Sequence, residues 1–549
     1  MPTGGELLVK TLEAQGIDRV FCVPGESYLA VLDALHDSPI DITICRQEGG
    51  AAMMADAIGR ITGQVGVAFA TRGPGATNAA AGLHIAFQDA SPMILFIGQV
   101  QRDAREREAF QEIEYRRMFT EVAKWVAEID DPARLPEIVG RAFAVALSGR
   151  PGPVVLALPE DMLRQMTNAQ AGRPVQPAIP KPGNEELARL EVLLSAAQRP
   201  FAVLGGSGWD QESVDAMQDF AEAWSLPVGC SFRRQMLFDH LHPCYAGDVG
   251  IGPNPKLAAL VHEADLLLLI GARMGEMPSS GYTLIDIPDP KQTLVHVYPD
   301  PEELGRVYRP DLPIVAAPAA FAKAVTRLKP KETPGWAEGT KAAHAEYTSY
   351  STPVQSHPGD VQMGDLISWM NQHLPDDTIV CNGAGNYATW SHRFYRFRQF
   401  GTQAAPTSGS MGYGVPAAVA LKQHYPDRTV VAMAGDGCFL MNGQEFATAV
   451  QYETPIIVIV VDNGMYGTIR MHQERDYPDR VSGTELKNPD FAALAIAYGG
   501  HGETVRQTAD FAPAFQRAQA SNKPSILHVY LDPEAITTTR TLSEIRGTG

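Results

Sequence analysis

The sequence predicts an α/β protein that consists of three doubly wound parallel-sheet domains. Short, continuously apolar runs of strand length alternate with helix-length segments, and such strands are typical of parallel sheets that helices cover on both faces. The length of 549 residues suits about three or four domains. Two stretches near 165–185 and 329–360 are predicted linkers, the first of them rich in Pro, Ala and Gly. They delimit an N-terminal domain over 1–165, a central domain over 186–330 and a C-terminal domain over 360–549.

The expected strands are apolar runs, several of which end in turns that contain glycine or proline. In the N-terminal domain we expect strands at 19–23, 42–45, 65–70 and 93–97, with helices at 28–36, 50–61 and 77–88. In the central domain we expect strands at 201–204, 265–270 and 293–297 and a helix at 212–224. In the C-terminal domain we expect strands at 378–380, 429–434, 456–461 and 525–529 and a helix at 443–452.

The composition argues against several classes of function. There are 63 acidic and 45 basic residues, and the resulting formal charge of −18 argues against binding to nucleic acid or to an anionic membrane surface. The six Cys are scattered without a CxxC pair. The longest apolar runs are far shorter than the ~18–20 residues of a membrane helix, and the N-terminus has no apolar signal core. We therefore expect a soluble, cytoplasmic protein without a nucleic acid or membrane partner.

Two strand ends in the C-terminal domain predict a site for a metal ion and a diphosphate. The strand at 429–434 ends in Gly435-Asp436-Gly437, and the strand at 456–461 ends in Asp462-Asn463-Gly464. Asp436 and Asn463 are 27 positions apart, the length of one βαβ unit, so both should lie at the carboxyl edge where ligands bind. A carboxylate and an amide oxygen suit Mg²⁺, and glycines allow close approach of the backbone. Each motif alone would be an ordinary turn, but the spacing favours the metal site.

With this motif the sequence resembles the family of thiamin diphosphate (ThDP)-dependent decarboxylases and acetohydroxyacid (acetolactate) synthases, over nearly the whole chain. The resemblance implies that the N-terminal domain binds the pyrimidine of ThDP and the C-terminal domain its diphosphate. It also implies that Asp436 and Asn463 bind Mg²⁺ by side chain and Met465 by its backbone carbonyl. Further implied cofactor contacts are the matching loop Gly385-Asn386-Tyr387 and the motif neighbours Gly437, Cys438, Tyr466 and Gly467.

The segment 408–416 is a second match to the family. In relatives a large apolar residue at this place lies under the cofactor and imposes its V shape, and Met411 is the matching residue. The resemblance also implies that the carbonyl of Gly409 meets the 4′-amino group. Without the resemblance, Met411 would be an ordinary core methionine after a glycine turn.

Glu48 follows a short buried strand and precedes an apolar helix. A carboxyl in such a site should have a raised pKa, because burial disfavours its ionised form. The alternative is a Glu in the first turn of a helix, where the helix dipole favours a negative charge. The resemblance favours catalysis, and it implies that Glu48 exchanges a proton with the N1′ nitrogen of the cofactor.

Two further residues have two interpretations each, and two others depart from the family pattern. Glu26 lies where pyruvate decarboxylases carry an acid–base Asp, but it could equally be a first-turn helix Glu. Gln111 resembles the pocket Gln of acetohydroxyacid synthases, or it belongs to an ordinary surface helix. Arg72 replaces the Ser that relatives commonly carry. His472 lies near the place where many acetohydroxyacid synthases carry a Trp that selects the acceptor, so the choice of substrate stays open.

The resemblance leaves FAD in the central domain open. Gly205-Gly206-Ser207-Gly208 lacks the complete dinucleotide fingerprint, which argues against a nicotinamide enzyme. Met277 stands where acetohydroxyacid synthases usually carry a second Arg that supports FAD.

The implied function is an acetolactate synthase-like transferase or lyase that uses ThDP and Mg²⁺. It would decarboxylate a 2-oxo acid, most simply pyruvate, and join the remaining fragment to a second carbonyl compound. The alternatives are a non-ligating 2-oxo acid decarboxylase and the sulfoacetaldehyde acetyltransferase or oxalyl-CoA decarboxylase types. Family precedent implies a homodimer or homotetramer with each active site at a subunit interface.

Overall fold

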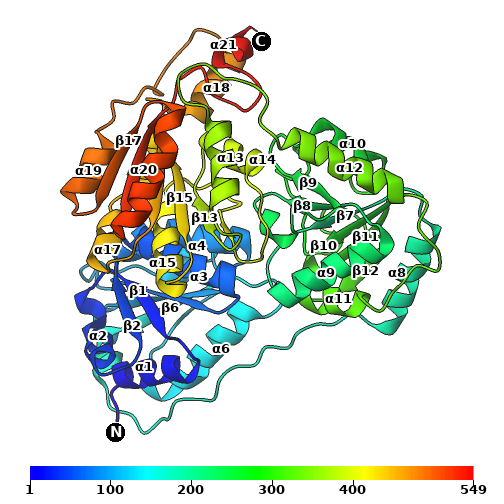
Figure 1. Ribbon diagram of the computed structural model, residues 1–549. Helices are drawn as coiled ribbons and strands as arrows, with labels where there is room; N and C mark the ends of the chain where they lie inside the picture. The colour runs from blue at the N-terminus through cyan, green and yellow to red at the C-terminus, as the bar shows by residue number, and fades with distance from the viewer. Residues whose placement is uncertain (548–549) are drawn as a thin grey trace. The chain divides into compact units, whose positions relative to one another are not determined.

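The computed structural model describes residues 1–547 and contains three six-stranded sheets in which every strand pair is parallel. The predicted α/β class with three parallel-sheet domains is confirmed (Figure 1). The chain forms two compact units. The first comprises residues 1–178, 406–427 and 439–456, and the second comprises residues 179–405, 428–438 and 457–549.

The first unit contains the sheet with the order β2-β1-β3-β4-β6-β5. Its strands are β1 (Arg19–Cys22), β2 (Asp41–Ile44), β3 (Gly66–Ala70), β4 (Met93–Gln99), β5 (Trp125–Glu128) and β6 (Pro153–Pro159). Its helices are α1 (Gly4–Ala14), α2 (Leu29–His36), α3 (Glu48–Thr62), α4 (Pro74–Asp89), α5 (Tyr115–Met118), α6 (Leu135–Leu147) and α7 (Glu160–Arg164), together with α15 (Gly414–His424) and α17 (Glu445–Gln451). α15 packs on both α3 and α17.

The second unit contains two sheets. The central one has the order β12-β11-β10-β7-β8-β9 and is formed by β7 (Pro200–Leu204), β8 (Val228–Ser231), β9 (Tyr245–Val249), β10 (Leu266–Ile270), β11 (Thr293–Tyr298) and β12 (Leu312–Val315). Its helices are α8 (Asn184–Ala196), α9 (Gln211–Trp224), α10 (Pro255–Glu263), α11 (Pro318–Val325) and α12 (Ala337–Tyr350).

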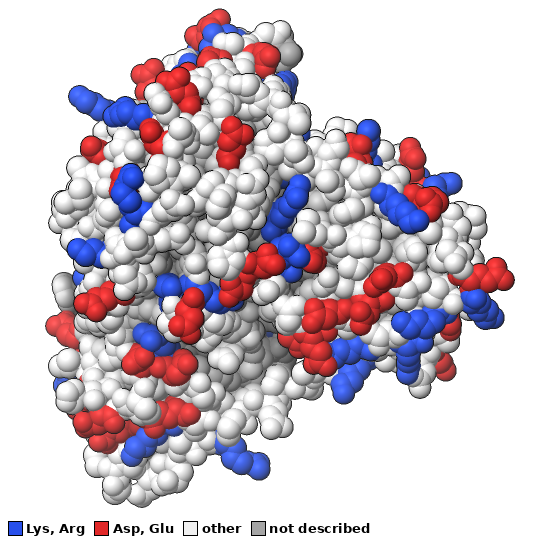
Figure 2. Space-filling model, in the orientation of Figure 1, with Lys and Arg blue, Asp and Glu red and all other residues white. Residues whose placement is uncertain are grey.

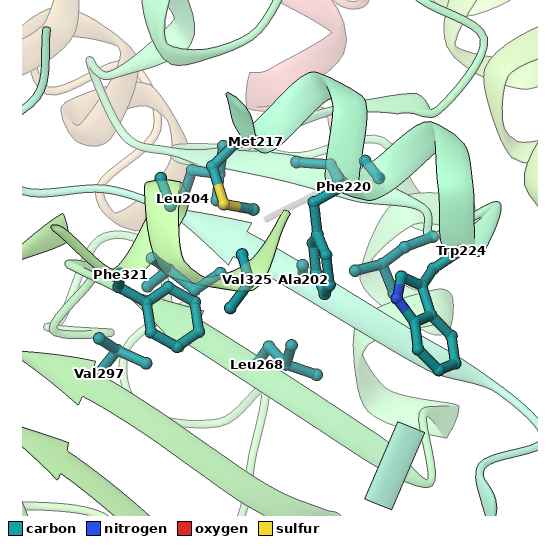
Figure 3. Close-up of a cluster of buried hydrophobic side chains, with 14 of the residues drawn as sticks. Ala202, Leu204, Met217, Phe220, Trp224, Leu268, Val297, Phe321 and Val325 are labelled. Atoms are coloured by element: carbon teal, nitrogen blue, oxygen red, sulfur yellow. The ribbon is translucent and has the colours of Figure 1, made fainter. Parts of the chain in front are cut away.

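Alternate residues of the central strands pack on opposite faces of the sheet. Leu266 and Leu268 belong to the core that includes α9 and α11, whereas Leu267 and Leu269 belong to the core that includes α10. Figure 3 shows the first of these cores, where Phe220 and other side chains of α9 face the sheet. Burial on both faces explains why these strands are continuous apolar runs.

The third sheet has the order β14-β13-β15-β16-β18-β17. Its strands are β13 (Ile379–Asn382), β14 (Gln403–Ala404), β15 (Val430–Gly435), β16 (Ile457–Asp462), β17 (His501–Val505) and β18 (Ser525–Tyr530). The remaining helices are α13 (Met363–His373), α14 (Tyr387–Phe394), α16 (Asp436–Asn442), α18 (Gly467–Asp476), α19 (Phe491–Ala497), α20 (Thr508–Ser521) and α21 (Leu542–Arg546).

One expectation about local structure was wrong, and one helix was not expected. The predicted linker at 329–360 contains the 14-residue helix α12, which packs on β9. Its composition is polar, and only Thr340, Ala343 and Tyr347 are buried, so the apolar face is too narrow to stand out in the sequence. The unexpected helix is α16, which begins at Asp436 itself, directly after β15, and precedes the expected helix, α17.

In residues 1–547 no helix is long and apolar enough to cross a membrane. All six cysteines are buried, and none of them forms a disulfide within residues 1–547. On the face in Figure 2, basic and acidic side chains are interspersed, and the described residues drawn there form no continuous basic area.

Candidate active site

The third sheet brings the two predicted strand ends to one edge. β15 and β16 are hydrogen-bonded neighbours with Gly435 opposite Val461, so Asp436 and Asp462 lie where adjacent strands end. Asn463 is the next residue and is half-buried. Asp436 and Asn463 therefore lie at the same carboxyl edge, the place where parallel sheets bind ligands.

The carboxylate of Asp436 is buried and held by two hydrogen bonds. The backbone N–H of Gly437 donates to Oδ1 (2.8 Å), and the amide of Asn488 donates to Oδ2 (2.7 Å). The same Asn488 amide donates to Oδ1 of Asp462 (2.8 Å), so it links the two carboxylates. Burial, followed by the proximity of the Asp462 carboxylate, raises the pKa of Asp436 to about 6, while the two hydrogen bonds act in the opposite direction.

Asp462 is held on its other side by His528. The backbone N–H of Phe491 donates to Nδ1 of His528 (3.3 Å), so the ring hydrogen is assigned to Nε2, which donates to Oδ2 of Asp462 (2.9 Å). Burial opposes ionisation of Asp462, but the hydrogen bonds from His528 and Asn488 outweigh it and lower the pKa of this carboxyl. Sequence reasoning missed Asn488 and His528, because neither has a fixed spacing from the glycine motif.

Tyrosine rings pack directly against the two glycines of the motif. A Cβ atom on Gly435 would lie 2.9 Å from the ring of Tyr387, and one on Gly437 would lie 2.5 Å from the ring of Tyr466. Any side chain at either position would displace a ring. The hydroxyl of Tyr387 lies 3.3 Å from Sγ of Cys438, so three predicted cofactor residues (Tyr387, Gly437 and Cys438) lie at this edge with Asp436.

The predicted residues of α14 and α18 meet at the same edge. Oδ1 of Asn386 accepts a hydrogen bond from Thr468 (2.8 Å), and its amide donates to the carbonyl of Ile536 (3.1 Å). Asn386 lies between Gly385 and the first residue of α14. Met465 is buried and forms an antiparallel bridge with Glu485, which fixes the backbone just before Gly467 begins α18.

Residues 531–547 form a segment that packs on α18. Ile536, Leu542 and Ile545 form a small buried cluster against Met471 of α18. The carboxylate of Glu474 in α18 receives two hydrogen bonds from Arg546 (2.7 and 3.0 Å), one to each oxygen.

We expect the Glu474→Gln substitution to loosen this segment at neutral pH. The hydrogen bonds with Arg546, and then those from Asp479 and Arg470, lower the pKa of Glu474 to about 2. A lowered carboxyl pKa stabilises the folded state at neutral pH, and this contribution is lost as the pH falls from the ordinary carboxyl range through about 2. Faster amide hydrogen exchange in residues 542–546 of the variant would show the loss, and Glu121→Gln, at an exposed glutamate outside the segment, is the comparison. Unchanged protection would show that the apolar cluster alone holds the segment.

Glu48 is the first residue of α3 and is buried in the first unit. The amide of Asn78, from α4, donates to its Oε2 (2.9 Å). A Cβ atom on Gly75 would lie 3.0 Å from the other carboxylate oxygen. The turn 71–78, which leads into α4, therefore lies directly beside Glu48.

A second carboxylate holds the turn before Glu48. Oε1 of Glu445, at the start of α17, accepts the backbone N–H groups of Arg46 and Gln47 (2.9 Å each). Oε2 of Glu445 accepts the hydroxyl of Thr448 (2.6 Å). Sequence reasoning missed Glu445, which is about 400 positions from the backbone that it holds.

The residues left ambiguous by the sequence lie close to this turn. Arg72 donates to Glu26 (2.9 Å), to the carbonyl of Phe110 (3.2 Å) and to Glu160 (3.4 Å). The Arg72 side chain is 10% exposed and that of Glu26 is 71% exposed, so the pair presents the carboxylate to solvent. A Cβ atom on Gly73 would lie 2.7 Å from Cβ of Gln111. Gln111 therefore packs against the turn, and it lies outside any regular helix.

The predicted Met411 segment is held at both ends within the first unit. The backbone N–H of Thr407 donates to both carboxylate oxygens of Asp89 (3.1 Å each). The hydroxyl of Tyr413 donates to Asp56 (2.6 Å). Between these residues Gly409 is exposed, with a φ of +68°, and Met411 is half-buried.

A buried ion cluster joins those two attachment points. The guanidinium of Arg60 lies 2.7 Å from Asp89 and 3.0 Å from Asp56, and all three side chains are at most 1% exposed. Burial raises the pKa of Asp56 despite the nearby charge of Arg60. One buried cation thus faces two carboxylates.

The glycines of the central domain are explained by packing. A Cβ atom on Gly206 would lie 2.2 Å from the carbonyl oxygen of Gly271, so the turns after β7 and β10 require glycine for their mutual contact.

Fold and site together define an enzyme of three α/β domains with polar clusters at the carboxyl edges of two sheets. Family models named "Thiamine pyrophosphate enzyme" match the chain in three parts: the N-terminal TPP binding domain over residues 2–118, the central domain over 187–325 and the C-terminal TPP binding domain over 383–529. The chain belongs to the thiamine pyrophosphate enzyme family.

Curated relatives include several acetolactate synthases. The large subunit of acetolactate synthase isozyme 2 of Escherichia coli K12 is 31% identical over 540 residues, which cover 96% of this chain and 95% of the relative. Acetolactate synthase of Arthrospira platensis is 32% identical, covering 96% of this chain and 94% of the relative. A probable acetolactate synthase large subunit of Methanocaldococcus jannaschii is 29% identical, covering 96% and 92%. The chain is thus a ThDP-dependent enzyme related to acetolactate synthases.

Proposed function

We propose that the enzyme uses ThDP and Mg²⁺ to decarboxylate a 2-oxo acid, most simply pyruvate, and joins the remaining fragment to a second carbonyl compound. The observation that carries this proposal is the meeting of Asp436 and Asn463 at adjacent strand ends, together with the buried Glu48 of the first unit. The acetolactate synthase relatives support the ligation step.

The donor groups at the third sheet fit Mg²⁺. Within residues 1–547 no Lys, Arg or His side chain forms an ion pair with the buried carboxylate of Asp436. Burial raises the pKa of this carboxyl. No group of three His, Cys, Asp or Glu in that range could hold a metal by itself. A site with one carboxylate, the Asn463 amide and the Met465 carbonyl would leave coordination positions for phosphate oxygens, as Mg²⁺ prefers.

The chain's own groups have separate tasks in this proposal. Asp436, Asn463 and Met465 would hold the metal, while Glu48 would exchange a proton with the pyrimidine and Asn78 would orient its carboxylate. Bound ThDP would supply the electron sink that makes loss of CO₂ feasible. Met411 would support the cofactor, within the segment that Asp89 and Asp56 hold.

A simple 2-oxo acid decarboxylase is the second candidate. Arg72 holds Glu26 in an ion pair beside the turn 71–78, so a carboxyl group that could protonate the reaction product lies at this edge. Such protonation would end the reaction before ligation.

The deciding experiment is incubation of the purified protein with ThDP, Mg²⁺ and pyruvate, with CO₂, acetolactate and acetaldehyde as readouts. CO₂ with acetolactate supports the ligase, and CO₂ with acetaldehyde supports the second candidate. No turnover on a panel of 2-oxo acids would refute both.

We also propose a homodimer or homotetramer whose active sites combine Glu48 of one subunit with Asp436 of another. Co-expression of the inactive variants Glu48→Gln and Asp436→Ala tests this. If each site uses both chains, a mixed dimer contains one intact site and regains activity. If each site lies within one chain, the mixture stays inactive.

Asn488→Ala should weaken Mg²⁺ binding about 10- to 100-fold, the usual effect of removing a partner that orients a metal ligand. The reason is that Asn488 fixes the Asp436 carboxylate and joins it to Asp462. Mg²⁺ titration of ThDP binding, followed by protein fluorescence, measures the effect. Asn184→Ala, in α8 of the central domain, serves as the control. An unchanged Mg²⁺ affinity would contradict the role of Asn488.

A further inference from the structure

The second unit contains a cavity of about 250 Å³ that no step of the proposed reaction uses. It lies between the residues that follow α12, the helix α13 and the stretch that follows α14. Its lining residues are Leu241, Ser351, Thr352, Pro353, Ser368, Asn371, Gln372, Leu374, Pro375, Asp376, Tyr395, Arg396 and Arg398.

Arg396 gives this cavity an unpaired positive charge. Its Nε is buried without a hydrogen-bond partner, and within residues 1–547 its guanidinium forms no ion pair. Arg398, the other cation of the lining, is paired with Asp239 (2.7 Å) and Asp376 (3.5 Å). Arg396 as a whole is half-buried, and its buried, unpartnered Nε carries a desolvation cost that hydrogen-bond acceptors on the guanidinium would offset.

The rest of the lining narrows the chemistry of the ligand. Tyr395 is 5% exposed, and its hydroxyl has no hydrogen-bond partner among the described residues, so it is a second donor beside Arg396. Leu241, Leu374 and Pro375 supply apolar surface. A cation without an ion pair, a hydroxyl donor and a lining that is apolar at Leu241, Pro353, Leu374 and Pro375 fit one carboxylate on a short hydrocarbon chain.

We propose that this cavity binds a small aliphatic carboxylate, with the carboxylate on Arg396 and Tyr395 and the hydrocarbon chain against the apolar lining. Asn371 connects the site to α14. Its amide donates to the carbonyl of Phe394 (2.7 Å), and its oxygen accepts the backbone N–H of Arg396 (2.9 Å). A ligand on Arg396 therefore acts on the last turn of the helix whose first turn carries Asn386 and Tyr387.

The test uses the full-length protein loaded with ThDP and Mg²⁺, with butyrate as the probe. Saturation-transfer NMR at constant ionic strength gives its dissociation constant, and inorganic phosphate is titrated in parallel. We expect Arg396→Gln to weaken butyrate binding about tenfold or more, the usual effect of losing a charge-assisted hydrogen bond. Tyr395→Phe, which keeps the ring, should weaken it by a smaller factor. Arg306→Gln, an exposed arginine elsewhere in the unit, should leave it unchanged.

Three results would overturn the proposal. One is the absence of butyrate binding, and another is binding that neither Arg396→Gln nor Tyr395→Phe weakens, which would place the probe elsewhere. The third is binding of phosphate without butyrate, which would show that the apolar lining takes no part. None of these results depends on turnover, so the test is independent of the proposed reaction.

Discussion

Glu48→Gln should slow hydrogen exchange at C2 of bound ThDP by about 10²- to 10⁴-fold, the usual contribution of a positioned acid–base group. Glu48 is buried at the start of α3, and Asn78 holds one of its oxygens at 2.9 Å. Glutamine keeps the shape and accepts the same hydrogen bond, but it cannot exchange a proton with the pyrimidine. Rapid acid quench followed by NMR of the released cofactor measures the exchange rate.

The control for this prediction is Glu26→Gln. Glu26 lies at the same edge but presents an exposed carboxylate paired with Arg72. We expect the Glu26 variant to exchange the C2 proton at the wild-type rate, and we expect both variants to bind ThDP and Mg²⁺. Wild-type exchange in Glu48→Gln would refute the catalytic role of Glu48.

The part of the site that the sequence predicts is local in the chain. Asp436 and Asn463 are predicted as a site because they stand at two strand ends separated by one βαβ unit. Parallel pairing of β15 with β16 brings these strand ends together. Glu48 follows from its place between a buried strand and an apolar helix. The same reasoning predicts the α/β class, because apolar runs of strand length need cover on both faces.

The part that the sequence does not predict depends on contacts between distant segments. Glu445 holds the turn before Glu48 from about 400 positions away, and Asp89 holds Thr407 from more than 300. Asn488 belongs to a loop without regular periodicity, yet it bridges two carboxylates. α12 was mistaken for a linker because its buried face consists of only three residues. The roles of such residues can be assigned only when the partners that they contact are known.

Arg60→Leu should destabilise the first unit by about 3–5 kcal/mol, the usual loss when one partner of a buried ion pair is removed. Leucine leaves two buried carboxylates, Asp56 and Asp89, without the cation that lies 3.0 and 2.7 Å from them. The free energy of unfolding is best compared through hydrogen exchange of α3 and α4 amides, because a chain with several domains need not unfold in one step. Weaker ThDP binding should accompany the loss, since Asp89 and Asp56 hold both ends of the Met411 segment.

The pH dependence separates electrostatic from packing effects of this substitution. Burial already raises the pKa of Asp56 in the presence of Arg60, and removal of that charge should raise it further. A raised carboxyl pKa destabilises the folded state at neutral pH, and the penalty diminishes as the pH falls and the folded protein takes up a proton. The stability difference between wild type and Arg60→Leu should therefore shrink from pH 8 to pH 5.

Adding Asp56→Asn and Asp89→Asn to Arg60→Leu should recover part of the lost stability at pH 8, because these substitutions remove the buried negative charges. A pH-independent difference that the asparagines do not reduce would mean that Arg60 acts through packing, and that the two carboxylates hold the Met411 segment without it.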